Sequence, residues 1–303
     1  MVNFAHLINL EKTLDSRIEN KIKKFEEKQK RNLAKTEIDS DIFKEGLYEL
    51  GVTHNKFNHA YLSLNISGKE LVSIGVNFLN LIKQGIHKFI YLQNVNVSNN
   101  NLTTLEDLSP LKHLTTLIAS NNRISEMFDF HPPQNLEYAD YSYNEIKVIE
   151  SVSKNKYLKV LILHNNQIDK IQNLNENPYL EHLDLSFNNI QIIEDLDGLP
   201  LQKLNLMNNR IKTISGLENL NQLIDLNLSR NFIAKLKGLQ RLSNIRYLYL
   251  SSNLISRAKQ VAYITELHFL TDVDFCYNDV QNRKFYRFQV RIKFISSDFV
   301  LFA

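Results

Sequence analysis

The sequence predicts an elongated α/β solenoid, a stack of many short units of one kind, and three observations support this. One phrase, apolar-x-x-apolar-x-apolar-x-x-Asn-x-apolar, occurs nine times between Leu92 and Val280. Its Asn residues follow each other at steps of 21 or 22 residues, with a last step of 25. Before each Asn, apolar and polar residues alternate as in a strand with one buried face. Self-similarity at a fixed period of this length indicates a solenoid.

The Asn residues of the phrase are expected to hold the scaffold together rather than to perform chemistry. An Asn amide offers donors and acceptors to backbone groups that are left unpaired where the chain leaves a strand. One unit cannot bury its apolar face alone, so the units must stack. In one unit the core slice would be Leu201, Leu204, Leu206 and Ile211. The nine Asn residues are Asn100, Asn122, Asn144, Asn166, Asn188, Asn209, Asn231, Asn253 and Asn278.

The second half of each unit has a spacing of three, which aligns side chains on 3₁₀ turns rather than on a full α-helix. Ile211, Ile214, Leu217 and Leu220 show it in one unit. We therefore expect a right-handed arc of about ten parallel strands with a 3₁₀-rich convex side. Two features depart from the pattern, and we interpret them as local bulges, with docking points as the alternative. They are the pair Asn155 and Asn177 in the last apolar slot, and the irregular segment MFDFHPP at 127–133.

The regions outside the nine repeats of residues 92–280 differ in character. Residues 1–40 form a basic amphipathic helical arm, which either binds another protein or folds back on the first repeat. Residues 41–91 form an N-terminal cap and an atypical first repeat, in which Lys69 replaces the Asn. Residues 281–303 form a C-terminal cap helix with Phe285, Phe288, Ile292 and Ile295 on one face. The partner-binding stripe of the arm would be Leu10, Leu14, Ile18, Ile22 and Phe25.

Composition and motifs argue for a non-catalytic protein of the cytoplasm. The single cysteine, Cys276, cannot form an internal disulfide, and no signal peptide or membrane-length apolar stretch is visible. Phosphate-binding, zinc-protease and serine-hydrolase motifs are absent. His164 and His182 near Asp140 and Asp184 are interpreted as solvated or partner-facing side chains. We therefore expect no metal, no cofactor and no small-molecule ligand.

Charge argues against nucleic acid as a partner. Residues 1–35 carry nine Lys or Arg and five Asp or Glu, a net of +4, whereas the whole chain has +3. The solenoid is therefore near neutral, at about −1, and does not continue the positive charge of the arm.

The concave sheet is the expected protein-binding surface. Residues that alternate with the buried Leu point outward, and equivalent positions of successive strands lie about 4.8 Å apart. An apolar and aromatic patch on such a surface usually marks an interface, and Asp residues beside it would favour a partner with Lys or Arg. The alternative is the ordinary composition of an open sheet. The candidate residues are Ile118, Tyr138, Asp140, Tyr143, Val160, Ile162, His182, Asp184, Phe187, Tyr247 and Tyr249.

The repeat phrase resembles the 22-residue, phosphatase-regulator-like class of leucine-rich repeats, and three segments sharpen the match. The lead-in KEGLYELGVTHNKFNHAYLSLNISGKEL, with residues 99–117 and the phrase SYNEI at 142–146, resembles a leucine-rich-repeat family of ciliary radial spokes. The C-terminal segment with Tyr286, Arg287 and Val290 is similar to a cap shared by intracellular repeat proteins. The resemblance implies a scaffold subunit of the axoneme.

The function that this resemblance implies is that of a structural subunit of an axonemal radial spoke, most plausibly the third, in motile cilia. Its partners would be neighbouring spoke proteins in a large complex, with no membrane involved. The alternative is a regulatory subunit of protein phosphatase 1 that clamps the enzyme on its concave face.

The arm hypothesis makes a prediction of its own. Deleting residues 1–35 should leave the repeats folded, because the solenoid has its own N-terminal cap, but should weaken complex assembly. Circular dichroism and co-sedimentation with axonemes would measure the two effects. Unfolding of the truncated chain would mean instead that the arm is part of the cap.

Overall fold

The computed structural model describes residues 40–52, 59–74, 90–130, 133–282 and 300–302. One short α-helix, α2 (Ser40–Gly46), precedes the sheet, and the other described helices are 3₁₀ segments: η2 (Glu106–Leu108), η3 (Leu239–Arg241), η4 (Ala258–Tyr263) and η5 (Asp279–Asn282). The strands are β1 (Leu47–Val52), β2 (His59–Asn65), β3 (Asn94–Asn96), β4 (Thr116–Ile118), β5 (Tyr138–Asp140), β6 (Val160–Ile162), β7 (His182–Asp184), β8 (Lys203–Asn205), β9 (Asp225–Asn227), β10 (Tyr247–Tyr249), β11 (Asp272–Asp274) and β12 (Val300–Phe302).

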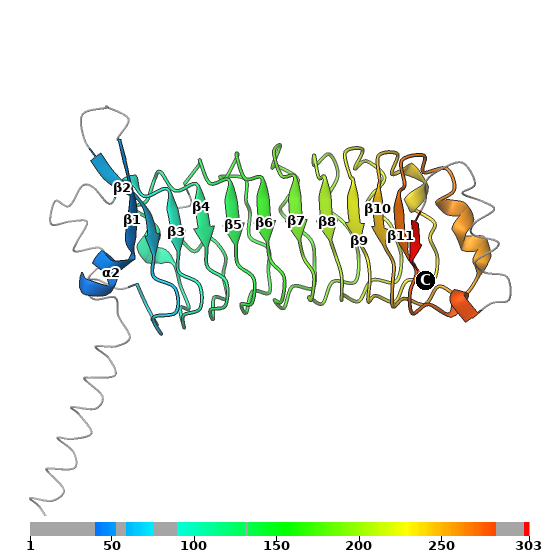
Figure 1. The fold of residues 1–303 in the computed structure, drawn as a ribbon, viewed down its shortest axis with the longest axis horizontal. Coiled ribbons are helices and arrows are strands. Elements are labelled where there is room, and N and C mark those ends of the chain that lie inside the picture. The colour runs from blue at the N-terminus through cyan, green and yellow to red at the C-terminus, as the bar shows by residue number, and fades with distance from the viewer. Residues whose placement is uncertain (1–39, 53–58, 75–89, 131–132, 283–299, 303) are drawn as a thin grey trace, which may run out of the picture.

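All twelve strands form one sheet in the order of the sequence, which makes an elongated row (Figure 1). β1 pairs with β2 in antiparallel fashion, and every later pair is parallel. From β3 to β11 each strand belongs to one of the nine predicted repeats, so the solenoid prediction is confirmed. We call each strand with its following turn and return segment a rung.

The core is a column of apolar side chains that runs the length of the row. The middle residue of each three-residue strand from β3 to β11 is buried, while its two neighbours are less buried. The predicted slice of Leu201, Leu204, Leu206 and Ile211 is at most 1% exposed. Strands of three residues have little pairing of their own, so they depend on burial between neighbouring rungs.

The nine Asn residues form a hydrogen-bonded ladder through this core. All are buried, and Asn188 illustrates the pattern. Its Oδ1 accepts from the backbone N–H of Ile168 on the preceding rung at 2.9 Å. Its Nδ2 donates to the carbonyl oxygens of Leu163, Leu185 and Ser186 at 3.0 to 3.2 Å. The scaffold role predicted for these residues is confirmed, since each amide joins its own turn to the rung before it.

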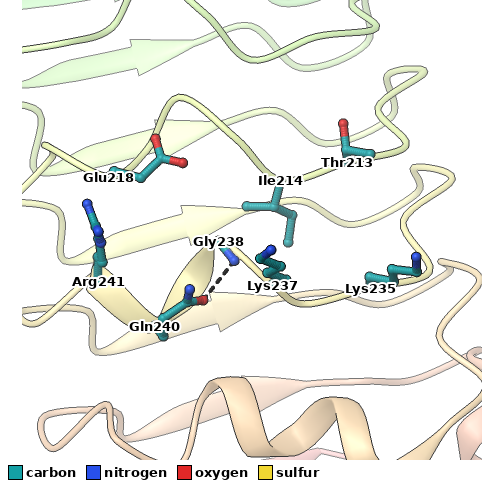
Figure 2. Close-up of a pocket in the computed structure, with 8 residues that line it drawn as sticks. All are labelled: Thr213, Ile214, Glu218, Lys235, Lys237, Gly238, Gln240 and Arg241. Atoms are coloured by element: carbon teal, nitrogen blue, oxygen red, sulfur yellow. Dashed lines mark hydrogen bonds between the residues drawn. The ribbon is translucent and has the colours of Figure 1, made fainter.

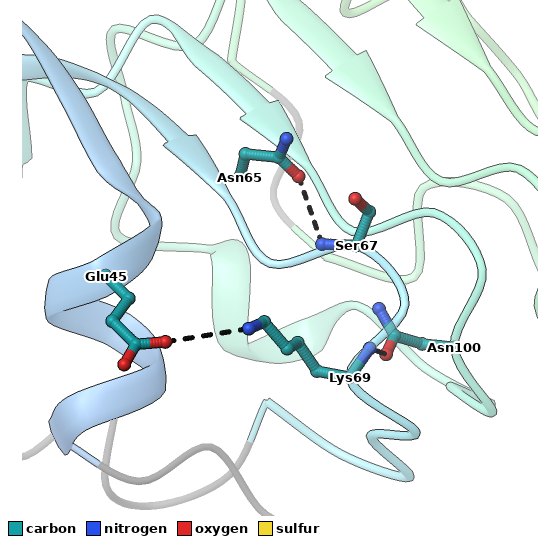
Figure 3. Close-up of polar contacts among 5 residues, drawn as sticks. All are labelled: Glu45, Asn65, Ser67, Lys69 and Asn100. Atoms are coloured by element: carbon teal, nitrogen blue, oxygen red, sulfur yellow. Dashed lines mark hydrogen bonds and ion pairs between the residues drawn. The ribbon is translucent and has the colours of Figure 1, made fainter.

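At the N-terminal end the ladder begins with Asn100, because the first rung has Lys69 in place of an Asn (Figure 3). Asn100 Oδ1 accepts from the backbone N–H groups of Lys69 and Leu71, at 3.0 and 3.1 Å. The side chain of Lys69 turns to α2 instead, where its Nζ lies 3.6 Å from Glu45 Oε2. Lys69 therefore takes the sequence position of an Asn but not its role, because the cap has α2 beside it rather than another rung.

The convex side is less helical than the spacing of three predicted. 3₁₀ helix occurs in the return segments at η2, η3 and η4, whereas the other described return segments are turns without assigned helix. At the far end η5 follows the last ladder residue, and β12 adds a strand to β11. The described end of the predicted cap helix is thus a strand. The apolar stripe of that helix and the N-terminal arm lie outside the described residues.

The two predicted bulges are packed into the core. Asn155 and Asn177 are fully buried, and their amides donate to Pro133, Val152 and Asn155 carbonyl oxygens at 3.1 Å. They form a short second ladder where other rungs hold Leu, although the Oδ1 atoms of both lack a partner.

The irregular segment at residues 127–130 packs against a buried tyrosine and hydrogen-bonds to it. Tyr141 takes a core position that five other rungs fill with Leu, and burial raises the pKa of its hydroxyl. The backbone N–H of Phe128 donates to that hydroxyl at 3.3 Å, and the Phe128 and Tyr141 rings meet edge to face at 5.4 Å. Met127 and Phe130 are buried, so this segment contributes to the core of its own rung.

The ladder predicts a large effect of a single substitution. Asn188→Leu should lower the free energy of unfolding by about 1 to 3 kcal/mol, because it leaves the buried N–H of Ile168 without a partner and removes three further hydrogen bonds to carbonyl oxygens of two rungs. Urea denaturation followed by circular dichroism measures this. The matched control is Asn189→Leu, the same change at a half-buried neighbour outside the ladder, which should have a much smaller effect. Equal effects of the two substitutions would refute the role of the ladder.

Candidate protein-binding surface

The outward face of the parallel sheet carries two columns of side chains, set by the strand register. The first column contains Tyr138, Val160 and His182 on successive strands. The second contains Ile118, Asp140, Ile162 and Asp184. These positions are half-buried rather than fully exposed, because equivalent side chains of neighbouring rungs shield one another.

On most strands the residue of the second column has a structural task in its own turn, and this includes Asp140 and Asp184, which we expected to serve recognition. On seven strands an Asn or Asp here accepts a hydrogen bond from the backbone N–H two residues later, an Asx turn that starts the bend. Asp184 also accepts from the Ser186 hydroxyl and from Asn205 Nδ2, so both of its carboxylate oxygens are engaged. The seven residues are Asn65, Asn96, Asp140, Asp184, Asn205, Asn227 and Asp274.

Three strands lack this hydrogen bond between the side chain and the turn. β4, β6 and β10 place Ile118, Ile162 and Tyr249 in the same position, where no side-chain oxygen can accept from the turn. An apolar residue here does not serve its own turn, so its outward side chain is free to serve a partner.

A second local constraint concerns the residue before each ladder Asn. All nine have a left-handed backbone with φ between 53° and 58°. Asn is the residue with a side chain that tolerates this conformation best, and it occurs at four of the nine positions, Asn99, Asn121, Asn165 and Asn208. The others are Tyr143, Phe187, Arg230, Ser252 and Tyr277. At the aromatic residues among them the left-handed backbone is strained, and the scaffold does not require an aromatic side chain there.

The two departures coincide in one part of the face, over β4 to β7. Tyr143 is 54% exposed, and its ring meets the His164 ring edge to face at 4.8 Å. Phe187 follows β7, one rung beyond His164. Together with Ile118, Tyr138, Val160 and Ile162 these residues make an apolar and aromatic surface, which we call the concave patch. The structure therefore brings most of the predicted residues together.

Tyr247 and Tyr249 do not join the concave patch. They lie on β10, separated from β7 by β8 and β9, which carry Lys203, Asn205, Asp225 and Asn227. Their neighbour Tyr277 was missed by the sequence analysis, although it is the most exposed large apolar residue described, at 83%. Its place directly before a ladder Asn was the signal that could have identified it, as it could have for Tyr143 and Phe187.

Between the two aromatic regions lies a polar hollow of about 210 Å³ around His182, Lys203, Asp225 and Tyr249. Burial, with the positive charge of Lys203, lowers the pKa of His182. Burial raises the pKa of Asp225, against the opposing effect of Lys203. The neutral form of His182 is therefore favoured over the cation.

The two histidines of this face were candidates for metal ligands. Within the residues that the structure describes, no three His, Cys, Asp or Glu side chains are grouped as metal ligands. His164 and His182, considered as possible ligands in the sequence, lie beside Tyr143 and Lys203 respectively. The described helices include none with the length and apolarity needed to span a membrane.

Comparison with known proteins supports the repeat assignment. Residues 179–199 match the family model described as Leucine Rich Repeat. Over 83 residues, 27% of this chain, the sequence is 40% identical to leucine-rich repeat-containing protein 23 of Bos taurus. The human protein of that name is 35% identical over 89 residues, 29% of this chain. These matches span 21% and 23% of the two relatives.

Other matches show how widely the repeat is shared. A human leucine-rich repeat and guanylate kinase domain-containing protein is 33% identical over 91 residues, which are 30% of this chain and 10% of that protein. Among solved structures, internalin C2 of Listeria monocytogenes has a TM-score of 0.56 and 26% identity, covering 62% of this chain and 82% of that one. The fold is therefore a leucine-rich-repeat solenoid, whereas the shared repeat does not specify a function.

The left-handed position of Phe187 makes a prediction about stability. Phe187→Asn should raise the free energy of unfolding by about 0.5 to 1 kcal/mol, because Asn tolerates φ near 56° better than Phe does. Urea denaturation would measure the change. The control is Phe232→Asn, the same substitution at an exposed phenylalanine outside the left-handed positions. If Phe187→Asn destabilises the chain, the Phe187 side chain stabilises the scaffold by packing and is not available mainly for a partner.

Proposed function

We propose that this leucine-rich-repeat protein is a non-catalytic structural subunit of an axonemal radial spoke in motile cilia, the third spoke in our assignment. The observation that carries the proposal is the 40% identity over 83 residues to leucine-rich repeat-containing protein 23. The resemblance of residues 44–71 to the lead-in of ciliary spoke proteins points to the same class. The localisation that follows is the axoneme, and the partners are neighbouring spoke proteins.

The scaffold suits a spacing element. Each rung is joined to the one before it by a strand pair and by the bonds of a buried Asn amide, as at Asn209, which donates to Leu185 and accepts from Ile190. A rung therefore cannot tilt without breaking several buried hydrogen bonds. Such a chain keeps two attached partners at a fixed separation, as a structural complex requires.

The concave patch is the proposed main interface. Rigid aromatic side chains in the centre of an interface each contribute about 2 kcal/mol or more to binding, and Tyr138, Tyr143 and Phe187 are of this kind. Both carboxylate oxygens of Asp184 are engaged, one by its own turn and the other by Asn205 on the next strand. Any preference for a basic residue therefore depends on Asp140, where only Oδ1 accepts a hydrogen bond, from the backbone N–H of Ser142. The fitting partner is therefore an apolar segment with a Lys or Arg that reaches β5.

A double substitution tests the interface. Tyr138→Ala with Phe187→Ala should release the protein from detergent-extracted axonemes without changing its circular dichroism, because neither side chain belongs to the buried core. Immunoblotting of the axonemal and soluble fractions measures the release. The matched control is Tyr157→Ala with Phe232→Ala, which removes one exposed Tyr and one exposed Phe outside the concave patch.

The outcomes separate the interface from the function. If both double variants stay in the axoneme, the concave patch is not the interface, and the ends or the convex side take its place. If the wild-type protein is absent from axonemes, the spoke assignment is wrong. Recovery of the wild-type protein in a soluble complex with protein phosphatase 1 would support the regulatory alternative.

A further inference from the structure

The near-neutral charge of the solenoid conceals a basic region. Residues 210–263 contain nine Lys or Arg and two Asp or Glu, a net of +7 in a chain whose total is +3. The rung before this region is acidic in its return segment, with Glu194, Asp195 and Asp197. The expectation that the repeats carry no concentrated positive charge was therefore wrong, because a sum over the chain cannot show segregation.

The positive charges of this region line up between rungs. Lys235 and Lys237 recur 22 residues later as Arg257 and Lys259, at equivalent places on the next rung, and all four are exposed. Like charges at neighbouring positions repel each other, so this arrangement costs stability without a counter-charge. Within the described part of the chain, none of the four has a carboxylate within 4.0 Å.

A hollow of about 410 Å³ lies on the earlier side of these charges, between two return segments. Figure 2 shows Lys235 and Thr213 at one end, Lys237 near the middle below Ile214, and Arg241 at the other end beneath Glu218. Ile214 and Gly238 lie between the two ends. The hollow thus has cations at both ends, an apolar contact between them and one acidic residue.

Gly238 brings the two segments close together. Its φ is 114°, and a Cβ there would lie 2.5 Å from the Ile214 carbonyl oxygen, so only Gly fits without a backbone shift. Its N–H donates to Gln240 Oε1 at 2.7 Å, which ties the turn to the start of η3. The shape of the hollow is therefore set by the backbone, and the exposed Lys and Arg can change without changing it.

We propose that this basic hollow binds an acidic, extended segment of a partner protein. Carboxylates of such a segment would meet Lys235 at one end, Lys237 near the middle and Arg241 at the other end. A nucleic acid fits less well, because its phosphates would continue past the hollow into the acidic rung of Glu194, Asp195 and Asp197. The surface belongs to the return segments rather than to the outward sheet positions, so this proposal does not depend on the radial-spoke function.

Fluorescence anisotropy with a labelled ten-residue polyglutamate peptide tests the proposal on the full chain. We expect binding that weakens as salt rises, and no binding of a polyglutamine peptide of equal length. The triple variant Lys235→Glu, Lys237→Glu, Arg241→Glu should weaken the affinity by about tenfold or more. Thr213→Glu should also weaken it, because it places a carboxylate of the chain in the hollow while all the cations remain.

Two matched controls locate the effect. The triple variant Lys147→Glu, Lys154→Glu, Lys156→Glu changes the net charge equally on another rung, and Thr103→Glu adds the same carboxylate elsewhere. Both should bind the peptide like the wild type. Equal loss in the controls would mean diffuse charge attraction, and no binding by the wild type would refute the site. Tighter binding of a ten-nucleotide oligothymidylate, abolished by the first triple variant, would replace the acidic peptide with nucleic acid as the ligand.

Discussion

The fold depends on one need, which is to satisfy the backbone groups of a tight turn that is buried between rungs. A three-residue strand whose turn contains a left-handed residue, three positions after the strand ends, leaves carbonyl oxygens and N–H groups that water cannot reach. The ladder Asn residues answer this need in every repeat, since each amide joins its own turn to the preceding rung. Leucine packing alone could stack the rungs, but it would leave those groups unpaired at a cost of about 1 to 3 kcal/mol each.

As a consequence, the residue type can vary more at some surface positions than at others. Where a position helps to form the turn, its residue is restricted: an Asn or Asp at the end of the strand, an Asn before the ladder residue. Ile118, Ile162 and Tyr249 break the first rule, and Tyr143, Phe187 and Tyr277 break the second. Departure from a local rule is better evidence of a binding role than exposure is, because the chain loses stability by it.

The same reasoning separates the two proposed surfaces. The concave patch is made of side chains that shield each other on a sheet, so its affinity comes from apolar area. The basic hollow is made of exposed cations around a turn whose shape Gly238 decides, so its affinity comes from charge and depends on salt. Two partners of different chemistry can therefore be held on one rigid support.

The sequence by itself determined the repeat, its register and the purpose of the Asn ladder, because these follow from periodicity and from the chemistry of one side chain. It also placed the strand residues of the concave patch on the outward face of the sheet, since outward positions follow from strand alternation. Only the tertiary structure decided that Asp184 is used by its own turn, that Lys69 contacts α2, and that Tyr247 and Tyr249 stand apart from the patch. Each of these depends on a neighbour in another rung, or on a backbone conformation, which a local pattern does not specify. The basic hollow is of the same kind, because Thr213 and Lys235 become neighbours only when their rungs stack.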